Sequence, residues 1–161
     1  MSESVSIEVD SVEGTWAVAR RLAAVLKPGD VVCLEGGLGA GKTTFVQGLA
    51  AAMGVEGRVT SPTFCIVQEH HAPGRALVHM DLYRLGGEDD VLAAGWEDYL
   101  SEGAVLAVEW PERAGALIPP DAVRVAISAP GEGECRTIAI SGLARELGAD
   151  GAGENLKGAN E

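Results

Sequence analysis

The sequence predicts an α/β fold: a three-layer sandwich in which helices cover both faces of a mostly parallel central sheet, with a C-terminal antiparallel β-hairpin. Stretches with helical spacing of apolar residues alternate along the chain with short, β-branched apolar runs, as in parallel sheets whose strands are joined by helices. A glycine-rich stretch lies between one such run and the next helical pattern. The last two apolar runs are joined by the turn APGEGE at 129–134, which predicts the hairpin.

The first half of the chain supplies two strands and two helices. Residues 4–9 alternate polar and apolar side chains and predict a short strand. VVCLE (31–35) predicts a buried strand, and KTTFVQGLAAAM (42–53) predicts a helix that ends near Gly54. Between the two strands lies a predicted helix with Ser11 or Thr15 as its N-cap, Pro28-Gly29-Asp30 after its end, and an apolar face of Trp16, Ala19, Leu22, Ala23 and Leu26.

The second half adds strands and one helical region. TSPTFCIVQE (60–69) predicts a turn followed by a strand, and residues 86–100 predict one or two short helices. Further strands are predicted at 75–81, 104–110, 122–128 and 135–141.

The length of 161 residues fits a single domain, which we expect to span residues 1–141. Residues 142–161 are rich in Gly, Ala, Glu and Asn and are expected to form a flexible tail. No apolar run approaches the roughly 18 residues that a membrane span needs. The N-terminus lacks the basic and apolar segments of a signal peptide, so we expect a cytoplasmic protein.

The charge balance bears on partners, because 24 acidic residues outnumber 12 basic ones and give a net charge of −12. Proteins that bind nucleic acid usually carry a basic patch, since their affinity comes largely from counterion release at phosphates. This chain is therefore not expected to hold RNA or DNA by itself. The cysteines at 33, 65 and 135 are too far apart for a disulfide framework or a zinc site and are expected to be small buried residues.

The glycine-rich stretch matches a phosphate-binding P-loop, Gly36-x-x-x-x-Gly41-Lys42-Thr43, with an apolar strand before it and a helix after it. Glycines allow a sharp turn that points consecutive N–H groups at phosphate oxygens, and the helix adds the positive end of its dipole. The Lys42 ammonium can reach the terminal phosphates, and the Thr43 hydroxyl can bind Mg²⁺. The chain is predicted to bind a nucleoside triphosphate through Gly36, Gly37, Leu38, Gly39, Ala40, Gly41, Lys42, Thr43 and Thr44.

A P-loop protein also needs an acid at the end of a neighbouring strand to hold Mg²⁺ directly or through water. Asp81 and Glu109 both follow apolar runs, although either can also be a simple surface acid at a strand end. Guanine recognition is not expected, because the asparagines, at 155 and 160, lie in the tail and form no Asn-Lys-x-Asp segment. No segment between strands resembles the arginine-rich lid of a small-molecule kinase.

The stretches LEGGLGAGKTTFVQGLA, VTSPTF, HMDLYRL and VEWPERAG, in this order, resemble the TsaE (YjeE) family over residues 11–140. The resemblance implies a P-loop NTPase-like fold and Mg-dependent ATP hydrolysis, with ATP and Mg²⁺ as ligands. It also implies a role as an accessory protein in threonylcarbamoyladenosine modification of tRNA position 37. The implied partners are TsaB and TsaD, with tRNA reached only through that complex and hydrolysis resetting the complex between turnovers.

The resemblance also implies residue roles. Lys42 matches the phosphate-binding lysine, Thr43 and Glu109 match the two Mg²⁺ ligands, and Asp81 matches an acid required for ATPase activity. We hypothesise that Asp81 orients or deprotonates the attacking water, directly or through Mg²⁺-bound water. One departure is Gly37, where the family usually has Asp (GDLGAGKT). A loop held by backbone N–H groups tolerates this change, so we expect weaker nucleotide affinity with unchanged chemistry.

Several positions keep two interpretations each. The TSPT segment (60–63) is either a switch loop, with Ser61 or Thr63 sensing the terminal phosphate, or a turn that opens a strand. His79 is expected to be a packed or surface histidine rather than a catalyst, and Trp110 is expected to fill the core rather than to pack beside the nucleotide. Arg84 is either a ligand for charge on the phosphoryl group or a salt-bridge partner within the fold. By the resemblance, Val12–Thr15 and Glu112–Arg113 approach the adenine. A stand-alone small-molecule kinase and a nucleotide-gated binding module remain the alternative functions.

Overall fold

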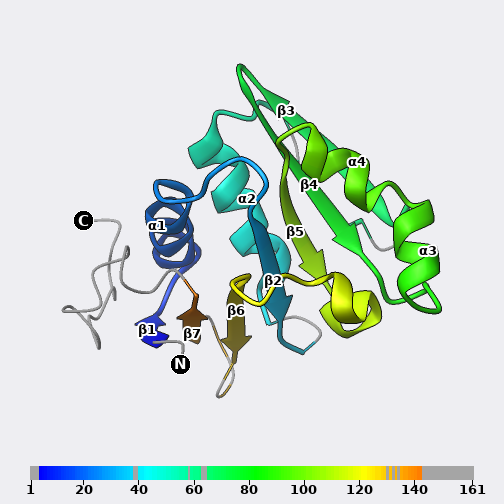
Figure 1. Ribbon diagram of the computed structural model, residues 1–161. Helices are drawn as coiled ribbons and strands as arrows, with labels where there is room; N and C mark the ends of the chain where they lie inside the picture. Colours follow the sequence, from blue (N-terminus) through cyan, green and yellow to red (C-terminus); the bar gives the residue numbers. More distant parts are fainter. Residues whose placement is uncertain are drawn as a thin grey trace.

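A computed structural model describes residues 4–37, 40–57, 59–62, 65–129, 131, 133 and 135–142 and confirms the predicted α/β class. A seven-stranded sheet has the strand order β1-β7-β6-β2-β5-β4-β3 (Figure 1). The strands are β1 (Ser4–Val9), β2 (Val31–Glu35), β3 (Val67–Ala72), β4 (Arg75–Asp81), β5 (Val105–Glu109), β6 (Val123–Ser128) and β7 (Arg136–Ser141).

The four central strands are parallel, and both ends of the sheet are antiparallel. β2 pairs in parallel with β5 and β6, and β5 pairs in parallel with β4. The predicted hairpin of β6 and β7 is present, and β1 adds to its outer edge by antiparallel pairing. At the other end, β3 and β4 form a second antiparallel hairpin. Antiparallel pairing is thus more extensive than the sequence patterns indicated.

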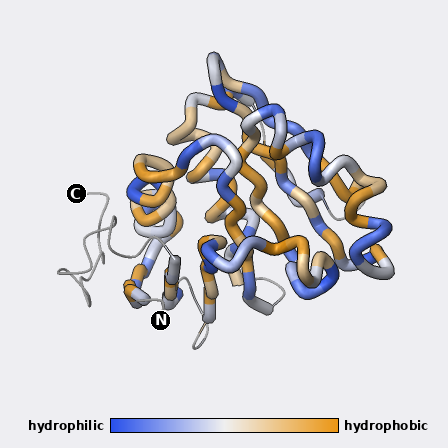
Figure 2. Tube along the Cα trace, viewed as in Figure 1, coloured by the Kyte–Doolittle hydropathy of each residue, from blue (hydrophilic) through white to orange (hydrophobic). Residues whose placement is uncertain are grey.

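Helices cover both faces of the sheet, which gives the predicted three layers (Figure 1). On one face, α1 (Val12–Ala23) and α2 (Lys42–Met53) pack against inward residues such as Val32 and Leu34 of β2. On the other, α3 (Glu88–Ala93), α4 (Trp96–Ser101) and the 3₁₀ helix η1 (Pro111–Leu117) enclose a second cluster. Figure 2 shows that apolar residues concentrate in the central strands between these layers.

The central strand β5 and the strands nearer the β1 edge differ in how much of each strand is buried. All five residues of β5 are buried, because helices cover both of its faces. In β1 and β6 burial alternates residue by residue, so only the face toward α1 and α2 is covered. The candidate site lies at the ends of parallel strands in the part of the sheet that helices cover on both faces.

Local signals account for the start of α1 and the end of α2. Ser11 is the N-cap of α1, and its Oγ accepts a hydrogen bond from the Gly14 N–H at 3.0 Å. Thr15, the other candidate cap, is buried within the helix. α2 ends at Gly54, whose φ of 93° lies in the left-handed region that favours glycine.

The structure departs from the sequence expectations at several positions. The strand predicted within 60–69 begins only at Val67, because the backbone N–H groups of Cys65 and Ile66 turn back to the Pro62 carbonyl. Cys33 is buried, but Cys65 and Cys135 are exposed, since they stand outside the strands rather than in them. The helix η1 was not predicted. Trp16, placed on the apolar face of α1, is 39% exposed, although it lies against Gly48 of α2.

Parts of the sequence predictions lie outside the described residues. These are Leu38 and Gly39 of the P-loop, Thr63 and Phe64 of the segment 60–69, Pro130, Glu132 and Glu134 of the predicted turn, and residues 143–161 of the predicted tail. Among the helices that the structure describes, none is long and apolar enough to cross a membrane.

Candidate functional site

The glycine-rich loop connects the end of β2 to the start of α2, as the motif requires. Gly36 has a φ of +153°, and a Cβ at this position would stand 2.6 Å from the backbone carbonyl oxygen of Ile127 in β6. Gly41, which precedes α2, has a φ of +116°. Both positions therefore need glycine, one to let two backbones approach and one to allow the turn into the helix. The first N–H groups of α2 lack helical partners and point toward the loop.

A pocket of about 830 Å³ opens beside this loop. Its volume lies within the range of small-molecule and cofactor sites. It brings the described part of the P-loop together with both strand-end acids and with one residue of the TSPT segment. The lining residues are Gly36, Gly37, Ala40, Gly41, Lys42, Thr43, Thr44, Ser61, Asp81, Tyr83, Glu109 and Trp110.

The two acids lie side by side because β4 and β5 are parallel and end together. Asp81 is the register partner of Glu109. Their exposed fractions are only 7% and 6%, so neither is the surface acid that the alternative interpretation allowed. The Asp81 Oδ1 accepts a hydrogen bond from the Tyr83 N–H at 3.1 Å, which fixes the carboxylate at the turn after β4.

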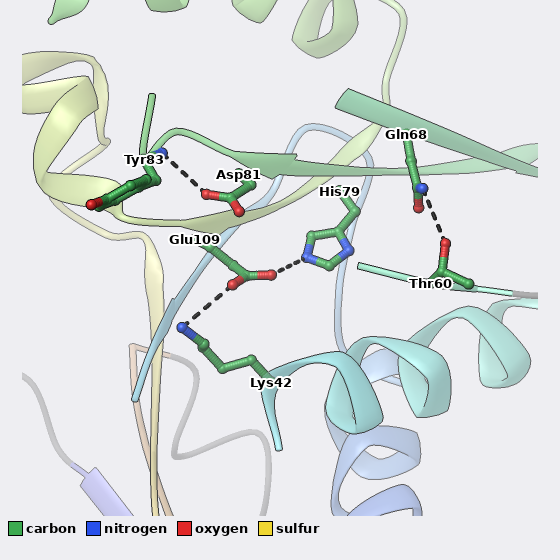
Figure 3. Close-up of polar contacts among 7 residues, drawn as sticks. All are labelled: Lys42, Thr60, Gln68, His79, Asp81, Tyr83 and Glu109. Atoms are coloured by element: carbon green, nitrogen blue, oxygen red, sulfur yellow. Dashed lines mark hydrogen bonds and ion pairs between the residues drawn. The ribbon is translucent and has the colours of Figure 1, made fainter. Parts of the chain in front are cut away.

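Glu109 is the centre of a polar cluster that reaches the loop (Figure 3). Its Oε1 lies 3.4 Å from the Lys42 Nζ, and its Oε2 lies 2.8 Å from the His79 Nε2. Burial raises the pKa of the Glu109 carboxyl, but the His79 hydrogen bond and the Lys42 charge outweigh this effect, and the pKa is lowered overall. The carboxyl is therefore held as a carboxylate, the form in which it can bind a cation.

His79 and Trp110 both lie next to the acids of the site. His79 is fully buried and is the hydrogen-bond partner of Glu109. Trp110 is 39% exposed and lines the pocket, which corrects its prediction as a core residue. A φ of 58° at Trp110 turns the chain after β5, and its ring packs on that of Tyr83 with centroids 4.8 Å apart.

The remaining candidates fall around the pocket. Ser61 lines it, whereas Arg84 is exposed and does not. Val12 and Thr15 line a small adjoining pocket together with Thr44 and Arg136. Glu112 and Lys42 share another small pocket, and the Arg113 guanidinium lies 6.0 Å from the centre of the Tyr83 ring.

Sequence reasoning missed Arg136, at the start of β7. Its Nε donates to the Ala40 carbonyl at 2.9 Å, which ties the P-loop to β7. A single arginine opening an apolar strand carries no local signal for this contact, because Arg136 and Ala40 are brought together only by the fold.

Comparison with known proteins agrees with this geometry. The family model described as "Threonylcarbamoyl adenosine biosynthesis protein TsaE" matches residues 9–139. The chain belongs to the TsaE family. The family has a role in the biosynthesis of threonylcarbamoyladenosine in tRNA.

Individual TsaE relatives match over most of their length. The TsaE protein of Bacillus subtilis is 41% identical over 122 residues, which cover 76% of each chain. That of Streptomyces coelicolor is 43% identical over 132 residues, covering 78% of this chain and 88% of the relative. A crystal structure of YdiB from Bacillus subtilis matches with a TM-score of 0.77 and 32% identity, covering 93% of this chain and 97% of that one.

Proposed function

We propose that this chain is a Mg²⁺-dependent ATPase that binds the TsaB–TsaD complex and hydrolyses ATP to support its turnover in tRNA threonylcarbamoyladenosine modification. The observation that carries the proposal is the pocket in which a P-loop lysine and two buried carboxylates face one another. Each component has a counterpart in the chemistry of phosphoryl transfer, in which positioning and electrostatic stabilisation dominate.

The triphosphate would lie against the P-loop and the first turn of α2. The close approach at Gly36 leaves no room for a side chain, so the loop presents backbone to the ligand. Lys42 and Thr44 line the same wall of the pocket, and Arg136 fixes the loop through the Ala40 carbonyl. A helix N-terminus that follows a glycine-rich turn is a favourable place for a phosphate.

The residues present also fit a Mg²⁺ ion bound together with the nucleotide. The Thr43 hydroxyl and the Glu109 carboxylate are oxygen ligands of the type Mg²⁺ prefers, and both line the pocket. When bound, the ion would neutralise charge on the phosphate oxygens. Lys42 now contacts Glu109 at 3.4 Å, and nucleotide binding would let the ammonium exchange that carboxylate for phosphate.

Asp81 is the residue we assign to the attacking water. It is buried beside Glu109, yet it makes no contact with Lys42 among those the structure describes and accepts its hydrogen bond from backbone. One carboxylate oxygen thus anchors the side chain while the other can accept a proton from water or orient it. Two neighbouring carboxylates then have separate roles, one toward Mg²⁺ and one toward water.

The experiment that tests the proposal is Mg²⁺-dependent ATP hydrolysis, measured for the chain alone and with purified TsaB and TsaD. Lys42→Ala is the blank, because it removes the ammonium and leaves the fold of α2. We expect a low rate alone, a strong rise with the partners and no activity in the blank. Hydrolysis that is absent under all these conditions would favour the nucleotide-gated binding module, and phosphate transfer to an added acceptor would favour a kinase.

A further inference from the structure

Three buried polar atoms on one face of the β3–β4 hairpin have no hydrogen-bond partner among the described residues: the Gln68 Oε1, the His70 Nε2 and the His79 Nδ1. Such atoms are uncommon, because leaving a buried donor or acceptor unsatisfied costs about 1–3 kcal/mol. Gln68 and His79 are direct register partners, so their side chains leave the hairpin on the same face and next to each other. In Figure 3 the His79 ring presents its free nitrogen toward Gln68.

Each of these two residues is bonded on its other side. The His79 Nε2 is 2.8 Å from the Glu109 Oε2, and the Gln68 amide nitrogen is 3.2 Å from the Thr60 Oγ1. Thr60 opens the TSPT segment, and Ser61 beside it lines the pocket. The unsatisfied pair therefore lies in the middle of a line of polar groups that starts at the segment after α2 and ends at Glu109.

Every group in this line is satisfied if Gln68 hydrogen-bonds to the His79 Nδ1, because a cationic ring can donate to the Gln68 Oε1 as it stands and a neutral ring can accept from the Gln68 amide. A carboxylate can only accept, so the His79 Nε2 must carry a proton and donate it to Glu109. In a neutral ring the Nδ1 is then an acceptor, and its partner must be a donor. A half-turn of the Gln68 amide offers its N–H to the Nδ1 and its oxygen to the Thr60 hydroxyl, since the two ends of an amide are alike in shape.

We propose that Gln68 and His79 are positioning residues that form a hydrogen-bonded relay, Thr60 to Gln68 to His79 to Glu109, linking the TSPT segment to the carboxylate assigned to Mg²⁺. This inference rests on the proposed function for the role of Glu109. The relay fixes the tautomer and orientation of His79, which in turn holds Glu109 for the cation. Partners that orient a metal ligand in this way typically change metal affinity 10–100-fold when they are removed.

The first test reads the imidazole of His79 directly and needs no nucleotide. Long-range ¹H–¹⁵N spectra of the three histidines, with His70→Gln and His71→Gln used for assignment, report which ring nitrogen carries the proton. We expect His79 to be protonated at Nε2 and its Nδ1 resonance to move in Gln68→Met. His70→Gln is the matched control, since it removes a neighbouring buried ring on the same face and should leave that resonance in place. A proton on Nδ1 with none on Nε2, or a resonance unmoved by Gln68→Met, would overturn the relay.

The second test measures how much Mg²⁺ strengthens binding of a non-hydrolysable ATP analogue, as the ratio of Kd without and with the ion. We expect the ratio to fall about tenfold in His79→Asn and severalfold in Gln68→Met, with affinity in the absence of Mg²⁺ unchanged. The double variant should be no worse than His79→Asn alone, because both changes break one relay. A wild-type ratio in both single variants overturns the positioning role. A wild-type protein indifferent to Mg²⁺ instead overturns the proposed function, while the spectra still decide the relay.

Discussion

The two sides of the pocket are built from different parts of the chain. The P-loop side is mostly backbone: Gly36 and Gly41 shape the turn, and one lysine is the principal charge. The opposite side is made of side chains at the ends of β4 and β5, where Asp81, Glu109 and His79 are buried. Backbone geometry holds a phosphate that has many equivalent oxygens, whereas directed side chains are needed where a proton or a cation must be placed. We therefore expect binding to depend on the loop side and turnover on the strand side.

The largest expected effect separates these two properties. Asp81→Asn keeps the size of the side chain and its hydrogen bond from the Tyr83 N–H but removes the base. We expect ATP turnover to fall about 10²–10³-fold, with the Kd for ATP nearly unchanged. Asp89→Asn, an exposed acid in the first turn of α3, is the control and should leave both unchanged. Parallel loss of binding and turnover in Asp81→Asn would refute the division between the two sides.

The loop side can be tested with adjacent glycines. Gly36→Ala places a Cβ 2.6 Å from the Ile127 carbonyl, whereas Gly37 has no atom within 4 Å of the corresponding position. We expect Gly36→Ala to lower the free energy of unfolding by about 2–3 kcal/mol and to weaken ATP binding. Gly37→Ala should change the stability little. Chemical denaturation and nucleotide titration of the two variants decide this, and equal effects would mean that the close approach is unimportant.

A third change tests how α2, which carries the loop, is seated against α1. At Gly48 a Cβ would stand 2.8 Å from the Ala19 Cβ and 3.0 Å from Trp16, both on α1. Alanine improves helix propensity by about 1 kcal/mol, but overpacking costs about 1–3 kcal/mol. We expect Gly48→Ala to be destabilising by about 1 kcal/mol in thermal or chemical unfolding. Adding Ala19→Gly should recover part of this loss, and a stabilised single variant would show that the helices can move apart freely.

The same contrast explains what the sequence could predict. The P-loop residues are contiguous in the sequence, so the motif and its flanking strand and helix could be predicted from it. Asp81 and Glu109 could be found in the sequence because each follows an apolar run. Parallel strands bring their carboxyl ends together, so the two acids lie at one edge of the sheet. The contacts of Arg136 with Ala40 and of His79 with Glu109 join residues far apart in sequence. They depend on strand order and register, which periodicity does not fix.

Trp110 shows, at a single residue, the limit of predicting structure from sequence. Its position at the end of the apolar run 104–110 favoured a place in the core. The chain instead takes a φ of 58° there, and the side chain turns out of the sheet to the mouth of the pocket. A left-handed conformation at a bulky residue is uncommon, and no neighbouring residue signals it.

The smallest expected effect concerns a hydrogen bond away from the pocket, between a helix and the edge strand β3. There Tyr99 of α4 donates to the Glu69 Oε2 of β3 at 2.8 Å. Burial and this hydrogen bond raise the pKa of Tyr99 to about 12, and hydrogen bonds from Tyr99 and then His71 lower the pKa of Glu69. Because Glu69 is half exposed, we expect Tyr99→Phe to cost only about 0.5 kcal/mol of unfolding free energy at neutral pH. Because the pKa of Glu69 is lower in the folded protein than in the unfolded chain, this contribution is fully present at pH values above the unfolded-state pKa. It is lost as the pH falls through the folded-state pKa of Glu69. The raised pKa of Tyr99 means that it is lost again as the pH rises through about 12. Urea unfolding of both proteins at pH 7 and pH 3 checks this, and a difference that grows in acid would show that the hydrogen bond does not involve the carboxylate.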